Sequence, residues 1–206
     1  MGGEAGGATA TPAAGIDLLL RRRSTSRLTE PAPADDDLRT ILRAAAAAPD
    51  HGELRPWRFV VLRGAAKDAF GQVLADAYAR RCRDAGSEPV PAKLDKERTK
   101  LGRAPVVLVI GAVRSDDPKI PWADQVGAAY AAAENALLAA TACGFGSMWR
   151  TGEPAFDPDV KRALGLSTSD AIVGFLYLGT PVDPVPKPPH DPDLSGLVTE
   201  WSPPGA

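Results

Sequence analysis

Three short stretches of this 206-residue chain hold the residues whose types and spacing could do chemistry. The densest positive charge is the run 21–27, which reads RRRSTSR. An arginine guanidinium can bind phosphate oxygens through two parallel hydrogen bonds, and serine or threonine hydroxyls add further donors. The run therefore fits an anionic group such as a phosphate. Arginines that simply end a helix and complement its dipole are the competing interpretation.

The second stretch is a loop bounded by Pro49 and Pro56, with the sequence PDHGELRPW over 49–57. Its neighbouring Asp50 and His51 could form part of a catalytic dyad. No serine or cysteine nucleophile stands in the Gly-x-Ser-x-Gly setting that would complete such a dyad. A surface loop with a half-buried tryptophan explains the stretch equally well, so we assign no catalytic side chain here.

The third stretch, 144–152, reads GFGSMWRTG and follows a helix of small residues expected at 124–143. Gly144 fits the residue just past the helix end, because glycine adopts the left-handed conformation without steric cost. Glycines at this spacing suit a backbone that runs close against a flat ligand, although a helix cap and turn is the competing interpretation. The Gly-Phe-Gly triplet follows a helix, so it lacks the strand context of a dinucleotide-binding fingerprint.

Apolar periodicity and turn signals predict the elements that must position these stretches. Helices are expected at 14–22, 38–48, 65–84, 124–143 and 158–164, and strands at 57–62, 105–112 and 171–178. Asp35–Asp37 supply N-cap candidates for the second helix, and Asp157 does so for the last one. The charged run 93–103 is expected to be a solvated helical face. Few strands scattered among more helices predict an α+β domain.

Composition excludes several classes of protein. A net charge of −2 argues against a nucleic-acid-binding protein. Cys82 and Cys143, with two histidines, give neither a disulfide framework nor a zinc spacing, so no metal site is expected. The longest apolar run, 104–113, is far shorter than the roughly 20 residues that span a bilayer. The N-terminus lacks the pattern of a signal peptide, which favours a cytoplasmic, soluble protein without membrane contact.

Taken in order, the stretches resemble the FMN-dependent nitroreductase family, and specifically its compact YdjA-type branch. The resemblance spans about residues 16–181. It rests on RRSxSRL at 22–28, APDH at 48–51 with PW at 56–57, GFG at 144–146 with WR at 149–150, and VGFLYLGTP at 173–181. It implies an α+β fold, a three-layer α/β/α sandwich around a mostly antiparallel sheet. It also implies a homodimer in which the partner's C-terminal segment completes the sheet edge.

We therefore expect a disordered tail at 1–13, an FMN-binding domain at 14–181 and a Pro-rich extension at 182–206 that lies on the partner subunit. The resemblance implies that Arg22, Arg23 and Ser24 hold the FMN phosphate, ribityl chain or pyrimidine edge. It implies that His51 reaches a flavin in the opposite subunit. The isoalloxazine would be lined by Trp149, Arg150 and Thr151, with the backbone at Thr151–Gly152 near the reactive N5.

The family's nicotinamide contacts map onto the end of the small-residue helix, at Ala139, Ala140, Thr141, Ala142, Cys143 and Gly144. The chain also departs from the family. Ser26 stands where many members have a basic residue, a position that Arg27 could serve instead. Arg55 stands where the branch has Gln, and Ala47 replaces a basic residue. These departures concern the choice of substrate and the flavin potential more than FMN binding itself.

The implied activity is transfer of hydride from NAD(P)H through FMN to a small acceptor, such as a nitroaromatic or a quinone, by a ping-pong mechanism. No side-chain nucleophile is required. Two alternatives stay open at this stage. One is a dehydrogenase or reductive dehalogenase on the same fold, and the other is a flavin-binding or interaction protein without turnover. The sequence names neither the physiological acceptor nor a preference between NADH and NADPH.

Overall fold

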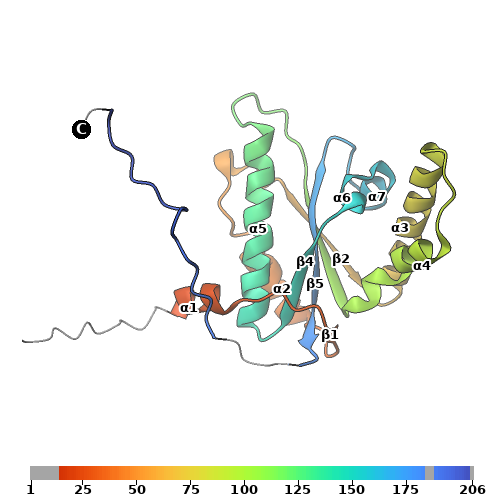
Figure 1. The fold of residues 1–206 in the computed structure, drawn as a ribbon, viewed down its shortest axis with the longest axis horizontal. Coiled ribbons are helices and arrows are strands. Elements are labelled where there is room, and N and C mark those ends of the chain that lie inside the picture. Colours follow the sequence, from red (N-terminus) through yellow and green to blue (C-terminus); the bar gives the residue numbers. More distant parts are fainter. Residues whose placement is uncertain (1–13, 184–187, 205–206) are drawn as a thin grey trace, which may run out of the picture. The chain divides into compact units, whose positions relative to one another are not determined.

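The computed structural model describes residues 14–183 and 188–204, so the tail expected at 1–13 lies outside the described residues. The chain divides into two compact units, one of Met1–Arg21 with Val185–Ala206 and one of Arg22–Pro184. In the first unit, α1 (Ala14–Arg21) carries an ion pair between Arg21 and Asp17 at 2.7 Å. The second unit, called here the core unit, contains the sheet (Figure 1).

An antiparallel sheet lies at the centre of the core unit. Its strands are β1 (Leu28–Thr29), β2 (Trp57–Arg63), β3 (Val106–Ala112), β4 (Gly146–Arg150) and β5 (Ala171–Pro181). β5 pairs with β1, β3 and β4, and β3 also pairs with β2. β3 is buried along its whole length, since both faces of the sheet are covered, which explains its uninterrupted apolar sequence VVLVIGA.

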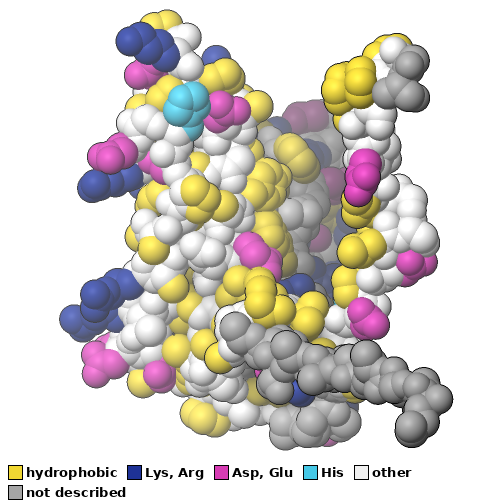
Figure 2. All heavy atoms as spheres, turned by 90° about the vertical axis from the view of Figure 1, so that its left-hand side faces the viewer, with side chains coloured by type: hydrophobic (Ala, Val, Ile, Leu, Met, Phe, Trp, Pro, Cys, Tyr) yellow, Lys and Arg dark blue, Asp and Glu magenta, His cyan; other side chains and the backbone are white. Residues whose placement is uncertain are grey.

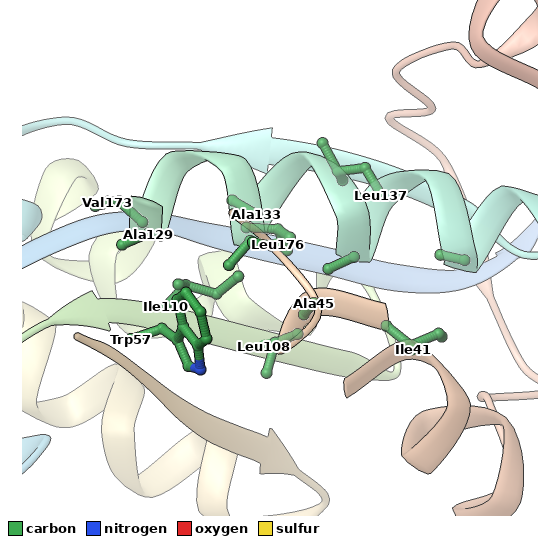
Figure 3. Packing of buried hydrophobic residues seen from close by; sticks show 14 of the residues in the cluster. Ile41, Ala45, Trp57, Leu108, Ile110, Ala129, Ala133, Leu137, Val173 and Leu176 are labelled. Atoms are coloured by element: carbon green, nitrogen blue, oxygen red, sulfur yellow. The ribbon is translucent and has the colours of Figure 1, made fainter. Parts of the chain in front are cut away.

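One face of the sheet is covered by α2 (Asp35–Ala45) and α5 (Trp122–Ala142). Figure 3 shows the packing there: Ala129 and Ala133 of α5 face Leu176 of β5, and Ile41 of α2 closes the layer. Because these α5 residues are alanines, the helix axis can approach the sheet closely. The small-residue helix predicted from the sequence is therefore a central element of the core.

The other face is covered by α3 (Ala65–Asp84), the 3-10 helix η2 (Lys100–Arg103), α6 (Glu153–Phe156) and α7 (Pro158–Ala163), while α4 (Pro91–Thr99) packs on α3. Leu74 of α3, Leu101 of η2 and Val160 of α7 are buried there against β5 residues. Figure 1 shows α5 on one side of the sheet and α3 with α4 on the other. The fold is thus the three-layer α/β/α arrangement with an antiparallel sheet that the resemblance implied, and this prediction is confirmed.

Several local predictions are confirmed and others are wrong. Gly144 follows α5 with φ +84°, and the Phe145 N–H donates to the Ala140 carbonyl at 2.8 Å, which closes the helix end as expected. Asp157 caps α7 as predicted. α2, however, begins at Asp35, with Ala34 as its N-cap, so the acidic residues form the first turn instead of preceding the helix. The segment 146–150, where no strand was predicted, is β4, because its backbone pairs with β5.

None of the helices within 14–183 and 188–204 combines the length and the apolar character needed to cross a membrane.

Candidate functional site

β4 brings two of the three predicted stretches together. The Thr25 N–H donates to the Ser147 carbonyl at 2.8 Å, and Ser24 forms a parallel bridge with the same residue. The arginine run therefore lies beside the strand that carries the Trp-Arg pair. Within the run, Arg22 Nε lies 3.3 Å from Glu134 Oε1 on α5, and an Arg23 guanidinium nitrogen donates to the Arg22 carbonyl at 2.8 Å.

A cleft opens beside β4 and β5 on the sheet face that packs against α3. Two depressions share Arg103, Arg150 and Tyr177 and so lie side by side; together they are called here the α4 cleft. The larger part has a volume of about 200 Å³. The remaining lining residues are Thr25, Ser26, Leu28 and Met148 on one side and Lys96, Glu97, Lys100, Leu101, Thr151, Pro154 and Phe175 on the other.

The α4 cleft carries excess positive charge. Lys100 pairs with Glu97 at 2.5 Å, whereas Arg103 and Arg150 make no ion pair within the described part of the chain. Tyr177 is only 6% exposed, and its hydroxyl makes no hydrogen bond to the residues that the structure describes. Burial raises the pKa of Tyr177, and the nearby charges of Arg103 and Arg150 offset only part of that rise. The phenol is therefore a protonated donor at neutral pH.

Trp149 faces the other side of the sheet from Arg150. Its Nε1 donates to the Val173 carbonyl at 3.0 Å, and its ring lies 5.8 Å from that of Tyr130 on α5. A Cβ on Gly174 would lie 2.1 Å from Trp149 Nε1, so the glycine makes room for the indole. Within one chain Trp149 therefore anchors β4 against β5 and does not line the α4 cleft, which Arg150 and Thr151 do line.

Gly152 adopts φ +118° and ψ −170°, a conformation that is essentially restricted to glycine. It turns the chain from the edge of the cleft into α6. An ionic network holds the following residues, since the buried Asp157 carboxylate accepts from both Arg80 and Arg81 on α3. Burial alone would raise the pKa of Asp157, but the Arg81 hydrogen bond, two backbone N–H groups and the Arg80 charge outweigh it and lower the pKa.

The loop 49–57 lies on the opposite side of the sheet from the α4 cleft. His51 Nδ1 lies 3.1 Å from Asp124 Oδ2 in the first turn of α5, the helix that covers the other face. The loop is conformationally strained, with φ +55° at Glu53 and +48° at Arg55. Asp50 closes it by accepting from the Arg55 N–H at 2.5 Å. His51 and Arg55 are consequently held exposed at the surface.

Two further predicted sets lie outside the cleft. Arg27 pairs with Asp183 at 2.7 Å, and both side chains are mostly exposed. The segment predicted to contact nicotinamide, Ala139–Gly144, is the last turn and cap of α5. Ala140 there is fully buried, and the Thr141 hydroxyl donates to the Leu137 carbonyl at 2.9 Å. Ala142 and Gly144 are the exposed residues of this segment.

The sequence interpretation missed the residues that give the cleft its charge and its hydrogen-bond donor. The run 93–103 was interpreted only as a solvated face, yet Lys96, Lys100 and Arg103 line the cleft. The sequence signal that could have revealed this is a leucine within the charged run, Leu101, which the structure shows to be 1% exposed and to anchor the run to the core. Tyr177 could have been found from the alternation of β5, which places it on the same face as Phe175.

Comparison with known proteins assigns the family. The family model described as the Nitroreductase family matches residues 19–180. The chain belongs to the nitroreductase family. It is 39% identical over 184 residues to the provisionally named NAD(P)H nitroreductase YdjA of Escherichia coli K12, covering 89% of this chain and 97% of that protein. A provisionally named NAD(P)H nitroreductase of Haemophilus influenzae is 32% identical over 187 residues, with the same coverage.

Solved structures agree with this nitroreductase-family assignment. A nitroreductase-like family protein from Bacillus cereus superposes with a TM-score of 0.75 at 20% identity, covering 94% of this chain and 99% of that chain. A protein from Desulfovibrio desulfuricans, provisionally described as a nitroreductase and solved in complex with FMN, gives 0.68 at 26% identity, covering 94% and 100%. The resemblance inferred from the four motifs is confirmed.

Proposed function

We propose that this nitroreductase-family protein binds FMN in the α4 cleft and passes hydride from NAD(P)H to a small acceptor, such as a nitroaromatic or a quinone, by a ping-pong mechanism. One observation carries the proposal. The cleft lies between β4 and Thr25 and Ser26 of the arginine run, and it combines excess positive charge with a tyrosine hydroxyl that opens into it and with apolar lining residues. A planar, anionic aromatic ligand matches these features, and a solved relative contains FMN.

The residues present fit such a ligand. Arg22, Arg23 and Ser24 are not among the residues that line the cleft, and Arg22 lies 3.3 Å from Glu134 on α5. They directly precede Thr25 and Ser26, which do line it, and from there their guanidinium and hydroxyl donors would serve the phosphate end and the ribityl chain. Arg150 and Thr151 provide the wall of the ring pocket, and Gly152 allows the backbone to approach the ring closely. When bound, FMN supplies the hydride chemistry, so the protein's task is to bind, orient and exclude water. No side chain is assigned as a nucleophile.

Trp149 contributes indirectly in this account. Its indole fixes β4 against β5, and Arg150 and Thr151 follow directly on the same strand. The nicotinamide would stack over the flavin from the open side of the cleft. Within the 139–144 segment, the exposed Ala142 and Gly144 are the proposed contacts, whereas Ala140 is fully buried.

The site is completed by a second copy of the chain. His51 and Arg55 lie on the opposite side of the sheet from the cleft, so in one chain they cannot serve the flavin that Arg150 contacts. Their strained loop holds them at the surface, where a partner could receive them. We propose a homodimer in which each flavin contacts Arg22 of one chain and His51 of the other. The C-terminal segment after residue 182 would lie on the partner and complete its sheet edge.

The outward side of α5 is suited to such a dimer. Figure 2, which views the molecule from this side, shows hydrophobic side chains gathered on the face and charged ones mostly along its borders. Tyr130 of α5 is 47% exposed. A Cβ on Gly127 would meet nothing within 4 Å. The small outward residues of α5 would let two chains approach closely.

The dimer is tested at Gly127. Gly127→Glu places a charge on the open face without a clash inside the chain, so it should shift sedimentation at micromolar concentration from dimer to monomer. Gly127→Ala is the matched control and should leave the dimer intact. A Gly127→Glu chain that stays dimeric and retains FMN would contradict the use of this face.

Mixed dimers test the shared site. Chains carrying Arg22→Ala and chains carrying His51→Ala are combined and titrated with FMN. If the two residues serve one flavin from opposite chains, each mixed dimer has one intact site and one doubly damaged site. If both residues come from the same chain, every site carries one lesion, and no site of wild-type affinity appears.

Turnover separates the alternatives. Under anaerobic conditions, NAD(P)H should bleach the flavin absorbance, and a nitroaromatic or quinone should restore it in a separate step. A flavin that binds but does not bleach would favour a binding protein without turnover. Bleaching by a substrate other than NAD(P)H would favour a dehydrogenase on the same fold.

A further inference from the structure

We propose that Arg103 places a positive charge at the pyrimidine edge of the bound flavin, with the Tyr177 hydroxyl donating beside it. This inference rests on the proposed FMN binding. It assigns a role to two residues that lie outside the arginine run, the His51 loop and the Gly-Trp-Arg segment. The proposal also assigns to Arg103, and not to Arg27, the positive charge that many family members carry at the position occupied here by Ser26.

Charge is the first observation. Arg103 and Arg150 line the same cleft and act on the same phenol, and neither makes an ion pair in the described ranges. The neighbouring Lys100 differs, because Glu97 pairs with it at 2.5 Å. Two like charges sharing a cleft repel one another, so an anion between them is favoured. This part of the cleft should therefore bind an edge of the ligand that carries negative charge.

The Tyr177 hydroxyl is the second observation. The residue is 6% exposed and lines the cleft from β5. Its hydroxyl has no hydrogen-bond partner in the part of the chain that the structure describes. The hydroxyl is not enclosed by protein atoms and opens into the cleft, so it can donate to a ligand carbonyl there. The flavin pyrimidine ring offers such carbonyls.

The backbone on either side of Arg103 is anchored, while the Arg103 residue itself is exposed and lines the cleft. Leu101 and Ala104, on either side, are 1% and 0% exposed. Lys67 Nζ donates to the Ala104 carbonyl at 2.6 Å. Arg27 is not equivalent, since its guanidinium pairs with Asp183 and does not line the cleft. Ser26 does line the cleft next to Arg103, which supplies the charge that a serine cannot.

The two residues should act differently. Two-electron reduction places negative charge on the N1 and C2=O edge of a flavin, so a cation there stabilises the reduced form more than the oxidised form. Arg103 should therefore raise the midpoint potential. A neutral phenol donates to a ring carbonyl in both redox states. Tyr177 should therefore act mainly on the affinity for FMN.

The test compares potentials of FMN-loaded variants. Arg103→Gln should weaken the binding of reduced flavin relative to oxidised flavin about tenfold, which lowers a two-electron potential by about 30 mV. Arg103→Lys keeps the charge and should recover most of the shift. Tyr177→Phe should weaken binding of oxidised FMN several-fold with a smaller change in potential. Arg27→Gln is the matched control and should leave both quantities unchanged.

An Arg103→Gln protein that retains FMN at the wild-type potential would overturn the proposal. If Arg103→Gln changed only the KM for NAD(P)H or for the acceptor, the proposal would also be overturned, because Arg103 would then bind that ligand and not the flavin. If Arg103→Gln fails to fold, two other variants decide the matter. The proposal would be overturned if Tyr177→Phe binds FMN with wild-type affinity and Arg27→Gln lowers the midpoint potential. A wild-type chain that binds no FMN would reject the proposed function, whereas an FMN-loaded enzyme insensitive to Arg103→Gln would reject this assignment alone.

Discussion

Gly174→Ala tests how β4, the strand that leads to the cleft, is held in place. A Cβ at this position would lie 2.1 Å from Trp149 Nε1 and 2.7 Å from its Cδ1. The indole must therefore move by about 1 Å or more to reach ordinary contact distances. That movement breaks the hydrogen bond from Nε1 to the Val173 carbonyl at 3.0 Å.

The cost has two parts. Overpacking a fitted contact destabilises by about 1–3 kcal/mol, and a lost hydrogen bond adds about 0.5–1.5 kcal/mol. Gly174→Ala should thus lower the free energy of unfolding by about 2–4 kcal/mol. For a chain of this size each kcal/mol lowers Tm by about 2–4 °C. Because β4 carries Arg150 and leads to Thr151, FMN affinity should fall as well.

A double-mutant cycle isolates the contact. Urea unfolding of apo protein at one fixed concentration gives the free energies of wild type, Gly174→Ala, Trp149→Phe and the double variant. Phe lacks Nε1 and is smaller, so Gly174→Ala should cost about 1–2 kcal/mol less in the Trp149→Phe background. Costs that add within about 0.5 kcal/mol would refute the reasoning, because the two residues would then be energetically independent.

Two further variants probe the supports of the cleft. Asp157→Asn should destabilise by about 2–3 kcal/mol, because Arg80 and Arg81 lose the buried carboxylate that they share. These contacts lower the pKa of Asp157 despite its burial, so their stabilisation is present above about pH 4 and is lost at lower pH. The free energies of unfolding of wild type and variant should therefore converge in acid. A difference that stays constant with pH would count against the ion network. Gly71→Ala places a Cβ 2.0 Å from the Arg98 carbonyl oxygen of α4, so it should lower the free energy of unfolding by about 1–3 kcal/mol and weaken FMN binding. If urea unfolding gives this variant the same free energy as wild type, α4 can shift to accommodate the added methyl group.

The sequence predicted the elements that carry their own local signal. The apolar run of β3 and the small-residue α5 follow from composition and periodicity, and Gly144 follows from the geometry of helix ends. β4 could not be predicted in this way, because 146–150 contains two polar residues and a glycine and becomes a strand only by pairing with β5. Its identity is a property of the sheet.

Part of the candidate site could likewise be predicted from the sequence, and part could not. The motifs included Arg150 and Thr151, which line the cleft, and the arginine run, which lies beside β4. They did not locate Arg103 or Tyr177, which are far apart in sequence and meet because β3 and β5 are neighbours, with Val107 paired to Tyr177. The motifs also placed Trp149 and Arg150 on one ligand surface, whereas the alternation of a strand sends their side chains to opposite faces.

The most direct test of flavin-dependent hydride transfer by this protein is an anaerobic titration of FMN-reconstituted protein with NADH and, separately, with NADPH, followed by flavin absorbance. We expect stoichiometric FMN binding to the dimer and complete bleaching of the oxidised flavin by at least one of the two nucleotides, with loss of binding in Arg150→Ala. Protein that takes up no FMN at micromolar concentration, or bound FMN that neither nucleotide reduces, would contradict this expectation.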